Sequence, residues 1–157
     1  MKTSHVTKSL VIGTLLLMAL GCQKEEKKRI PMPTTDLSSA PLMPKPMKVT
    51  STNSAFALDQ FTAIYTAAEA SGFEEVARYL AEKLKEKIAL DIPVNTTGNN
   101  TIERVIYINQ ADSLQNSAPE AYQLYINQDS VILNANTSEG AFRGIQTLRQ
   151  LVPMKSN

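Results

Sequence analysis

The 157-residue chain has an ordinary globular composition, with 43% hydrophobic and 20% charged residues, and its length suits one folded domain. Its net charge of +1 argues against a nucleic-acid partner, which would need a concentrated basic surface. The only cysteine, Cys22, excludes an internal disulfide and a cysteine-built zinc site, and the only histidine, His5, lies in a segment expected to be removed.

The N-terminal residues have the pattern of a secretory signal peptide, which we expect over residues 1–21. Lys2 and Lys8 precede an uncharged, largely apolar run from Leu10 to Leu20. A helix needs about 20 apolar residues to cross the core of a bilayer, so this run is too short to span one. The segment therefore predicts export of the chain.

A cysteine follows this run directly. The stretch Met18-Ala19-Leu20-Gly21-Cys22 resembles a bacterial lipoprotein box, although Ala19 stands where leucine is commonest. The resemblance implies that Cys22 is acylated, becomes the new N-terminus and attaches the protein to a membrane. The next residues, Gln23-Lys24-Glu25-Glu26, resemble the short acidic signal of Bacteroidetes lipoproteins, which implies display on the outer face of the outer membrane. The alternative is an ordinary signal peptide with an incidental cysteine.

Residues 22–47 are expected to form a disordered, proline-rich tether. They contain five prolines and few large apolar side chains, so they cannot bury enough surface to offset the entropy lost on ordering. A folded domain is then expected over 48–153, with a short tail at 154–157. At the start of this domain, short strands are predicted at 48–52 and 56–58.

The clearest predicted element is a helix that begins at Ser71. Ser71 and Glu74 have the spacing of a capping box, and Glu74 can pair with Arg78 one turn later. Apolar residues recur at helical spacing along one side of this helix: Phe73, Val76, Leu80, Leu84 and Ile88. Pro93 excludes any continuation, and the polar stretch 95–101 is expected to be a loop.

The second half of the domain predicts strands and a final helix. The run 105–108 is apolar on both faces, which favours a central strand. Alternating residues over 122–126 and 131–135 flank turn-forming residues, so these segments predict a hairpin. Ser138 is expected to cap the last helix, which Pro153 ends and in which Gly140 and Gly144 allow close approach to a neighbour.

These elements predict an α+β fold: a two-layer sandwich in which two main helices cover one face of a mixed or antiparallel sheet. No phosphate loop, metal-binding motif or nucleophile motif is present, so no catalytic, cofactor-binding or metal-binding residue is predicted. Tyr107, Tyr122 and Tyr125 lie on predicted strands, where packing within the sheet is their default role. The carboxylates are expected to be solvated surface acids, with no pair to nominate: Asp59, Glu69, Glu74, Glu75, Glu82, Glu86, Asp91, Glu103, Asp112, Glu120, Asp129 and Glu139.

Two segments carry a resemblance to a known family. Met43-Pro44-Lys45-Pro46-Met47-Lys48-Val49 is similar to the opening of the N-terminal domain of family-20 glycoside hydrolases, the β-N-acetylhexosaminidases. The stretch from Gly140 to Pro153, with Gly-Ala-Phe-Arg-Gly-Ile-Gln-Thr-Leu at its start, resembles the helix that closes that domain. The resemblance covers about 48–153.

The resemblance implies that a catalytic (β/α)₈ barrel follows the closing helix in such enzymes and carries an Asp-Glu pair. This chain has no Asp-Glu dipeptide and ends four residues after Pro153, so no activity is expected from it alone. Arg143 lies on the closing helix and is not the substrate-contacting arginine of the barrel.

Three hypotheses follow from this reading. The first is a non-catalytic N-terminal domain of a surface β-N-acetylhexosaminidase, occurring as a truncated or split product, whose barrel partner is supplied in cis or in trans. Such a domain should expose an apolar docking patch, lined in part by its last helix. The second is a stand-alone surface lipoprotein module that binds glycan or a partner protein. The third is a similar domain serving another glycosidase family.

Overall fold

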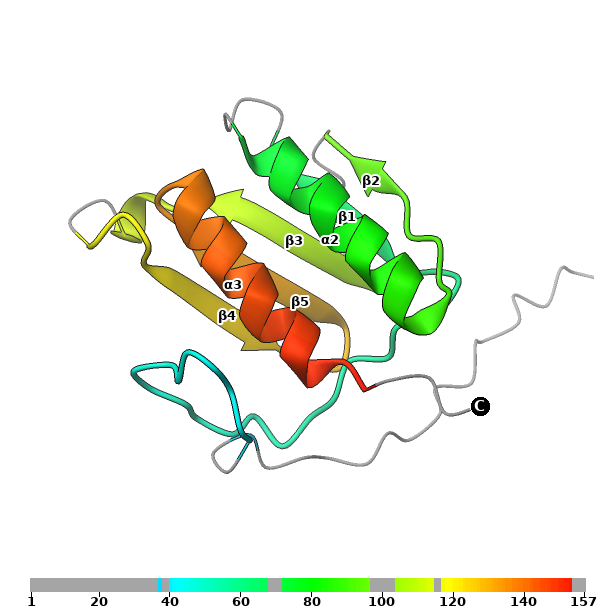
Figure 1. Ribbon diagram of the computed structural model, residues 1–157, viewed down its shortest axis with the longest axis horizontal. Helices are drawn as coiled ribbons and strands as arrows, with labels where there is room; N and C mark the ends of the chain where they lie inside the picture. Colours follow the sequence, from blue (N-terminus) through cyan, green and yellow to red (C-terminus); the bar gives the residue numbers. More distant parts are fainter. Residues whose placement is uncertain (1–36, 38–39, 68–71, 97–103, 115–116, 154–157) are drawn as a thin grey trace, which may run out of the picture. The chain divides into compact units, whose positions relative to one another are not determined.

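The structure, a computed structural model, describes residues 37, 40–67, 72–96, 104–114 and 117–153. All of these lie in one compact unit, residues 32–157. The described residues form two main helices and five strands (Figure 1). In chain order the elements are β1 (Ala63–Thr66), α2 (Phe73–Ile88), β2 (Val94–Asn95), β3 (Val105–Gln110), the 3₁₀ turn η2 (Asp112–Leu114), β4 (Tyr122–Ile126), β5 (Ser130–Ala135) and α3 (Ser138–Leu151).

The strands form one mixed sheet in the order β2-β1-β3-β5-β4. β1 runs parallel to both β2 and β3, β3 runs parallel to β5, and among these described strands the β4–β5 pair alone is antiparallel. Both α2 and α3 cover the same face of this sheet (Figure 1). The predicted α+β sandwich with two helices on one face is therefore confirmed.

The helix predicted from the apolar stripe is confirmed as α2, but its ends differ from the prediction. Its N-cap is Gly72, whose backbone is left-handed (φ 78°). Glycine has no side chain, so no side-chain hydrogen bond caps this end of the helix. Ser71, the expected cap, lies outside the described residues. At the other end Ala89 adopts φ 55° and its N–H donates to the Lys85 carbonyl at 2.9 Å. The helix thus ends at Ile88, and the turn at Ala89 rather than Pro93 ends it.

The two strands predicted at 48–52 and 56–58 are wrong. Both segments are irregular, although Phe56 and Leu58 pack against the core and the Thr52 hydroxyl donates to the Ile126 carbonyl at 2.9 Å. The sheet instead begins at β1, and it includes β2 at the start of the expected loop. These strands have only four and two residues. Such short segments show too little alternation to be recognised in a sequence.

The central strand and the hairpin are confirmed. β3 occupies the middle of the sheet, and β4 and β5 are joined by a tight turn. The Asn127 side-chain oxygen accepts hydrogen bonds from the backbone N–H groups of Asp129 and Ser130, both at 2.8 Å. This local bonding is why an asparagine starts the turn.

The final helix is also confirmed, with one correction. Its N-cap is Thr137 rather than Ser138, which is the first helical residue. The Thr137 hydroxyl accepts from the Gly140 N–H at 3.2 Å and donates to the Pro119 carbonyl at 2.7 Å. A threonine directly before a serine offers two possible caps, and the contact with Pro119 selects the first.

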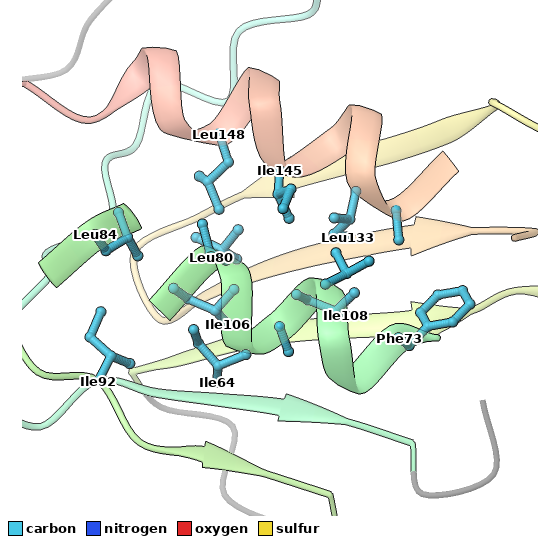
Figure 2. Packing of buried hydrophobic residues seen from close by; sticks show 14 of the residues in the cluster. Ile64, Phe73, Leu80, Leu84, Ile92, Ile106, Ile108, Leu133, Ile145 and Leu148 are labelled. Carbon is cyan, nitrogen blue, oxygen red and sulfur yellow. The ribbon is translucent and has the colours of Figure 1, made fainter. Parts of the chain in front are cut away.

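The core lies between the helices and the sheet. Leu80 of α2 and Leu148 of α3 point toward Ile106 of β3, and all three are almost fully buried (Figure 2). Along β3 and β5 alternate residues belong to this core cluster, namely Ile106, Ile108, Val131, Leu133 and Ala135, whereas the residues between them point to the other side of the sheet. The domain therefore has one layer of helices and leaves the opposite sheet face for other contacts.

Candidate functional site

Most carboxylates of the described residues are engaged by cationic side chains. Six ion pairs among the described residues engage six of these carboxylates: Glu74 with Arg78, Glu82 and Glu86 with Lys83, Asp91 with Lys85, Asp59 with Arg104, and Glu120 with Arg143. Glu69 and Glu103 lie outside the described residues. No cluster of potential metal ligands occurs among the described residues.

The pKa shifts of two carboxyl groups also argue against a role as a general acid. Hydrogen bonding to Lys83 lowers the pKa of the Glu86 carboxyl, and the backbone N–H at the start of α3 lowers that of Glu139. A general acid in a glycosidase needs a raised pKa, so that it holds a proton near neutral pH. The pKa values of Glu86 and Glu139 are lowered instead, so neither side chain is suited to act as the general acid.

A mixed aromatic and cationic patch lies on the outer surface of the helices; we call it the helix patch. It consists of Tyr79 and Lys83 of α2 with Phe142, Gln146 and Arg149 of α3. The rings of Tyr79 and Phe142 are 5.4 Å apart, and Phe142 remains 40% exposed. The Lys83 and Arg149 cations lie 5.5 and 5.6 Å from the centre of the Tyr79 ring.

The helix patch also contains a buried polar group without a partner. The Gln146 side-chain oxygen accepts from Arg149 at 2.6 Å, while its Nε2 is buried and donates to no group in the described structure. Such a donor is costly to leave unsatisfied. An apolar centre, flanking cations and an unused donor together are typical of a surface that contacts another protein domain.

The opposite side of the sheet, which we call the open face, has a different character. Tyr65 of β1 and Tyr107 of β3 pair directly, and their rings stack 5.7 Å apart. Tyr125 of β4 also points to this side, is 50% exposed, and donates from its hydroxyl to the Gln123 side-chain oxygen at 3.2 Å.

The three tyrosines considered in the sequence thus divide between the two faces. Tyr107 and Tyr125 lie on the open face, whereas Tyr122 faces the helices and its hydroxyl is 2.7 Å from that of Thr147. Sequence reasoning missed Tyr65, because β1 was not predicted, and it missed Tyr79. The residue types alone could not predict which tyrosine faces which side, because this depends on the strand register.

Part of the segment expected to be a tether contacts the domain. The Gln150 side chain accepts from the Met43 N–H and donates to the Met43 carbonyl, both at 2.9 Å. Cys22, the expected lipidation site, lies outside the described residues. In the described ranges, none of the helices has the length and apolar character required to cross a membrane.

The fold is shared with solved β-N-acetylhexosaminidases. The family-20 β-N-acetylhexosaminidase of Streptomyces coelicolor A3(2) matches with a TM-score of 0.52 and 27% identity, over 64% of this chain and 19% of that one. The family-20 exo-β-N-acetylglucosaminidase of Vibrio harveyi matches with a TM-score of 0.60 and 22% identity, over 79% and 17% of the two chains. The second likeness concerns the fold alone.

The sequence comparisons agree with these structures. A beta-hexosaminidase of Porphyromonas gingivalis is 29% identical over 148 residues, which is 93% of this chain but 18% of that protein. This chain therefore spans about a fifth of the length of its relatives. Residues 39–157 match the family model described as glycosyl hydrolase family 20, domain 2. The chain belongs to glycosyl hydrolase family 20, as its non-catalytic N-terminal domain.

Proposed function

We propose that this domain is the supporting domain of a surface β-N-acetylhexosaminidase, an enzyme that releases terminal N-acetylhexosamine from glycans. The catalytic barrel would be supplied in cis or in trans, the latter if the chain is a truncated or split product. Family membership and the helix patch support this proposal. The domain contributes a docking surface, and the barrel contributes the chemistry.

The observation that carries the proposal is the pairing of Phe142 with Tyr79 on the outer side of the helices. Phe142 exposes 40% of its surface beside Tyr79, whose ring has two cations close to it, and an exposed aromatic residue next to charged groups is typical of an interface. The unpaired Gln146 Nε2 is a donor that a carbonyl or carboxylate of the barrel would satisfy. In such enzymes the barrel follows the helix that corresponds to α3.

The docking can be tested with a chimera in which this domain replaces the matching region of the Porphyromonas gingivalis relative. We expect Phe142→Asp to weaken docking about 30-fold, because a charge placed in an apolar contact costs ~2 kcal/mol or more. Thermal unfolding of the chimera should then separate into two transitions. Tyr125→Asp is the matched control, since Tyr125 is similarly exposed on the other face. Equal behaviour of the two variants would contradict docking through the helix patch.

We also propose attachment of the mature protein to the outer membrane through an acylated Cys22, with display toward the medium. The lipoprotein-like sequence around Cys22 and the acidic residues after it support this proposal. The relative from Porphyromonas gingivalis is compatible with a Bacteroidetes origin.

A further inference from the structure

We infer that the open face of the sheet is a binding surface for a neutral glycan chain. The inference does not depend on docking of the barrel, because its residues lie on the side of the sheet opposite the helix patch. Three observations carry it: a row of three tyrosines and one isoleucine, a parallel row of amides, and the absence of charge from both.

The first observation is the strand register. Tyr65 is the partner of Tyr107, Tyr107 of Ile132, and Ile132 of Tyr125, so these residues form one row across β1, β3, β5 and β4. Neighbouring strands lie about 4.8 Å apart, so the row extends about 14 Å across the sheet. Aromatic and aliphatic side chains in a row of this length offer an extended apolar track on a rigid support.

The second observation is a row of amides beside the track. Asn109 is the partner of Asn134, and Asn134 of Gln123, two residues further along the strands. The two rows are therefore about 7 Å apart. Each amide carries both donors and an acceptor, and Gln123 already accepts from the Tyr125 hydroxyl, which fixes its orientation.

The third observation concerns charge. In β1, β3, β4 and β5, all fully described, none of the residues is Asp, Glu, Lys or Arg. An exposed sheet face normally carries charged side chains, which also protect its edges. A neutral face gives no attraction to an anionic polymer such as nucleic acid or a uronate.

These three features together match the chemistry of a neutral sugar chain. A pyranose ring has apolar C–H faces that lie against aromatic rings, and hydroxyl or acetamido groups at its edge that exchange hydrogen bonds with amides. Parallel apolar and amide rows present both kinds of contact along one direction. A protein partner would favour aromatic residues beside charged groups, as at the helix patch. The open face thus fits a neutral oligosaccharide laid across the strands.

The test is a calorimetric titration of the purified full chain with hexamers of N-acetylglucosamine and of glucose. We expect at least one hexamer to bind, with an affinity that is the same at low and high salt. Tyr125→Ala should lower the affinity at least tenfold, and Tyr125→Phe should retain most of it. Phe142→Asp, on the helix patch, should leave glycan binding unchanged, so that this proposal and the docking proposal fail separately.

Asn134→Ala provides a second variant, and the thermal midpoint of each variant shows whether it has folded. Absence of binding by both hexamers would overturn the inference. So would binding that survives unchanged in both Tyr125→Ala and Asn134→Ala, or binding of an anionic glycan alone.

Discussion

Replacing Gly140 with alanine is expected to lower the free energy of unfolding by about 1–3 kcal/mol, although alanine is the better helix former. A Cβ atom at Gly140 would lie 2.5 Å from the Ala121 carbonyl oxygen and 3.0 Å from that of Pro119. Both atoms belong to the backbone that leads into β4, so they cannot move aside as the end of a side chain could. Helix propensity alone predicts a gain of about 1 kcal/mol, the opposite sign.

Urea denaturation of the two proteins measures this difference directly. Arg143→Ala is the matched control, since it lies on the same helix, is exposed and loses only a surface ion pair with Glu120. The control should change the free energy of unfolding by less than about 1 kcal/mol. A Gly140→Ala protein as stable as the parent would show that α3 does not approach the β4 segment this closely. At Gly144 an added Cβ would instead meet a side chain, 2.2 Å from Cδ1 of Leu133, which is fully buried and has little room to turn away.

Replacing Cys22 with serine is expected to abolish lipid attachment completely. A serine hydroxyl cannot replace the thiol in forming the thioether that holds the lipid. Each buried CH₂ contributes about 0.8 kcal/mol to membrane binding, and several acyl chains act together, so no partial anchor of comparable strength remains. Cells fed an alkyne-labelled fatty acid should label the parent protein and not Cys22→Ser.

The measurement is in-gel detection of the incorporated label, normalised to the amount of protein. Ser9→Ala, inside the expected signal peptide, is the control and should keep the label. Labelling of Cys22→Ser equal to the parent, or no labelling of either protein, would mean that Cys22 is not the anchor. Only the second result would also favour the ordinary signal peptide.

The long elements of the fold could be predicted because their patterns repeat several times. α2 has an apolar stripe of five residues, and β4 and β5 alternate around a turn built by Asn127. β1 could not be predicted, because its four residues gain their stability from parallel pairing with strands distant in sequence. The segments 48–52 and 56–58 were predicted as strands, yet neither joins the sheet, and Phe56 and Leu58 of the second pack on the core instead.

The candidate surfaces were accessible to sequence reasoning only in part. The last helix was expected to line a docking patch, and Phe142 of α3 is exposed there. Tyr79 could not be assigned to that patch, because its contact with Phe142 depends on how the two helices pack. The open face could not be predicted for a similar reason. The residues from Tyr65 to Tyr125 form a row only because four strands pair in one particular register. Long-range pairing is what a local pattern cannot specify.

The central claim is that this domain supports a glycosidase without performing its chemistry. Incubation of the purified chain with a chromogenic N-acetylglucosaminide tests that claim most directly. We predict no hydrolysis above the rate of the buffer, because the sequence holds no Asp-Glu dipeptide and six of the described carboxylates form ion pairs. Hydrolysis by the pure chain that disappears when one of its own carboxylates is changed to the amide would contradict the claim.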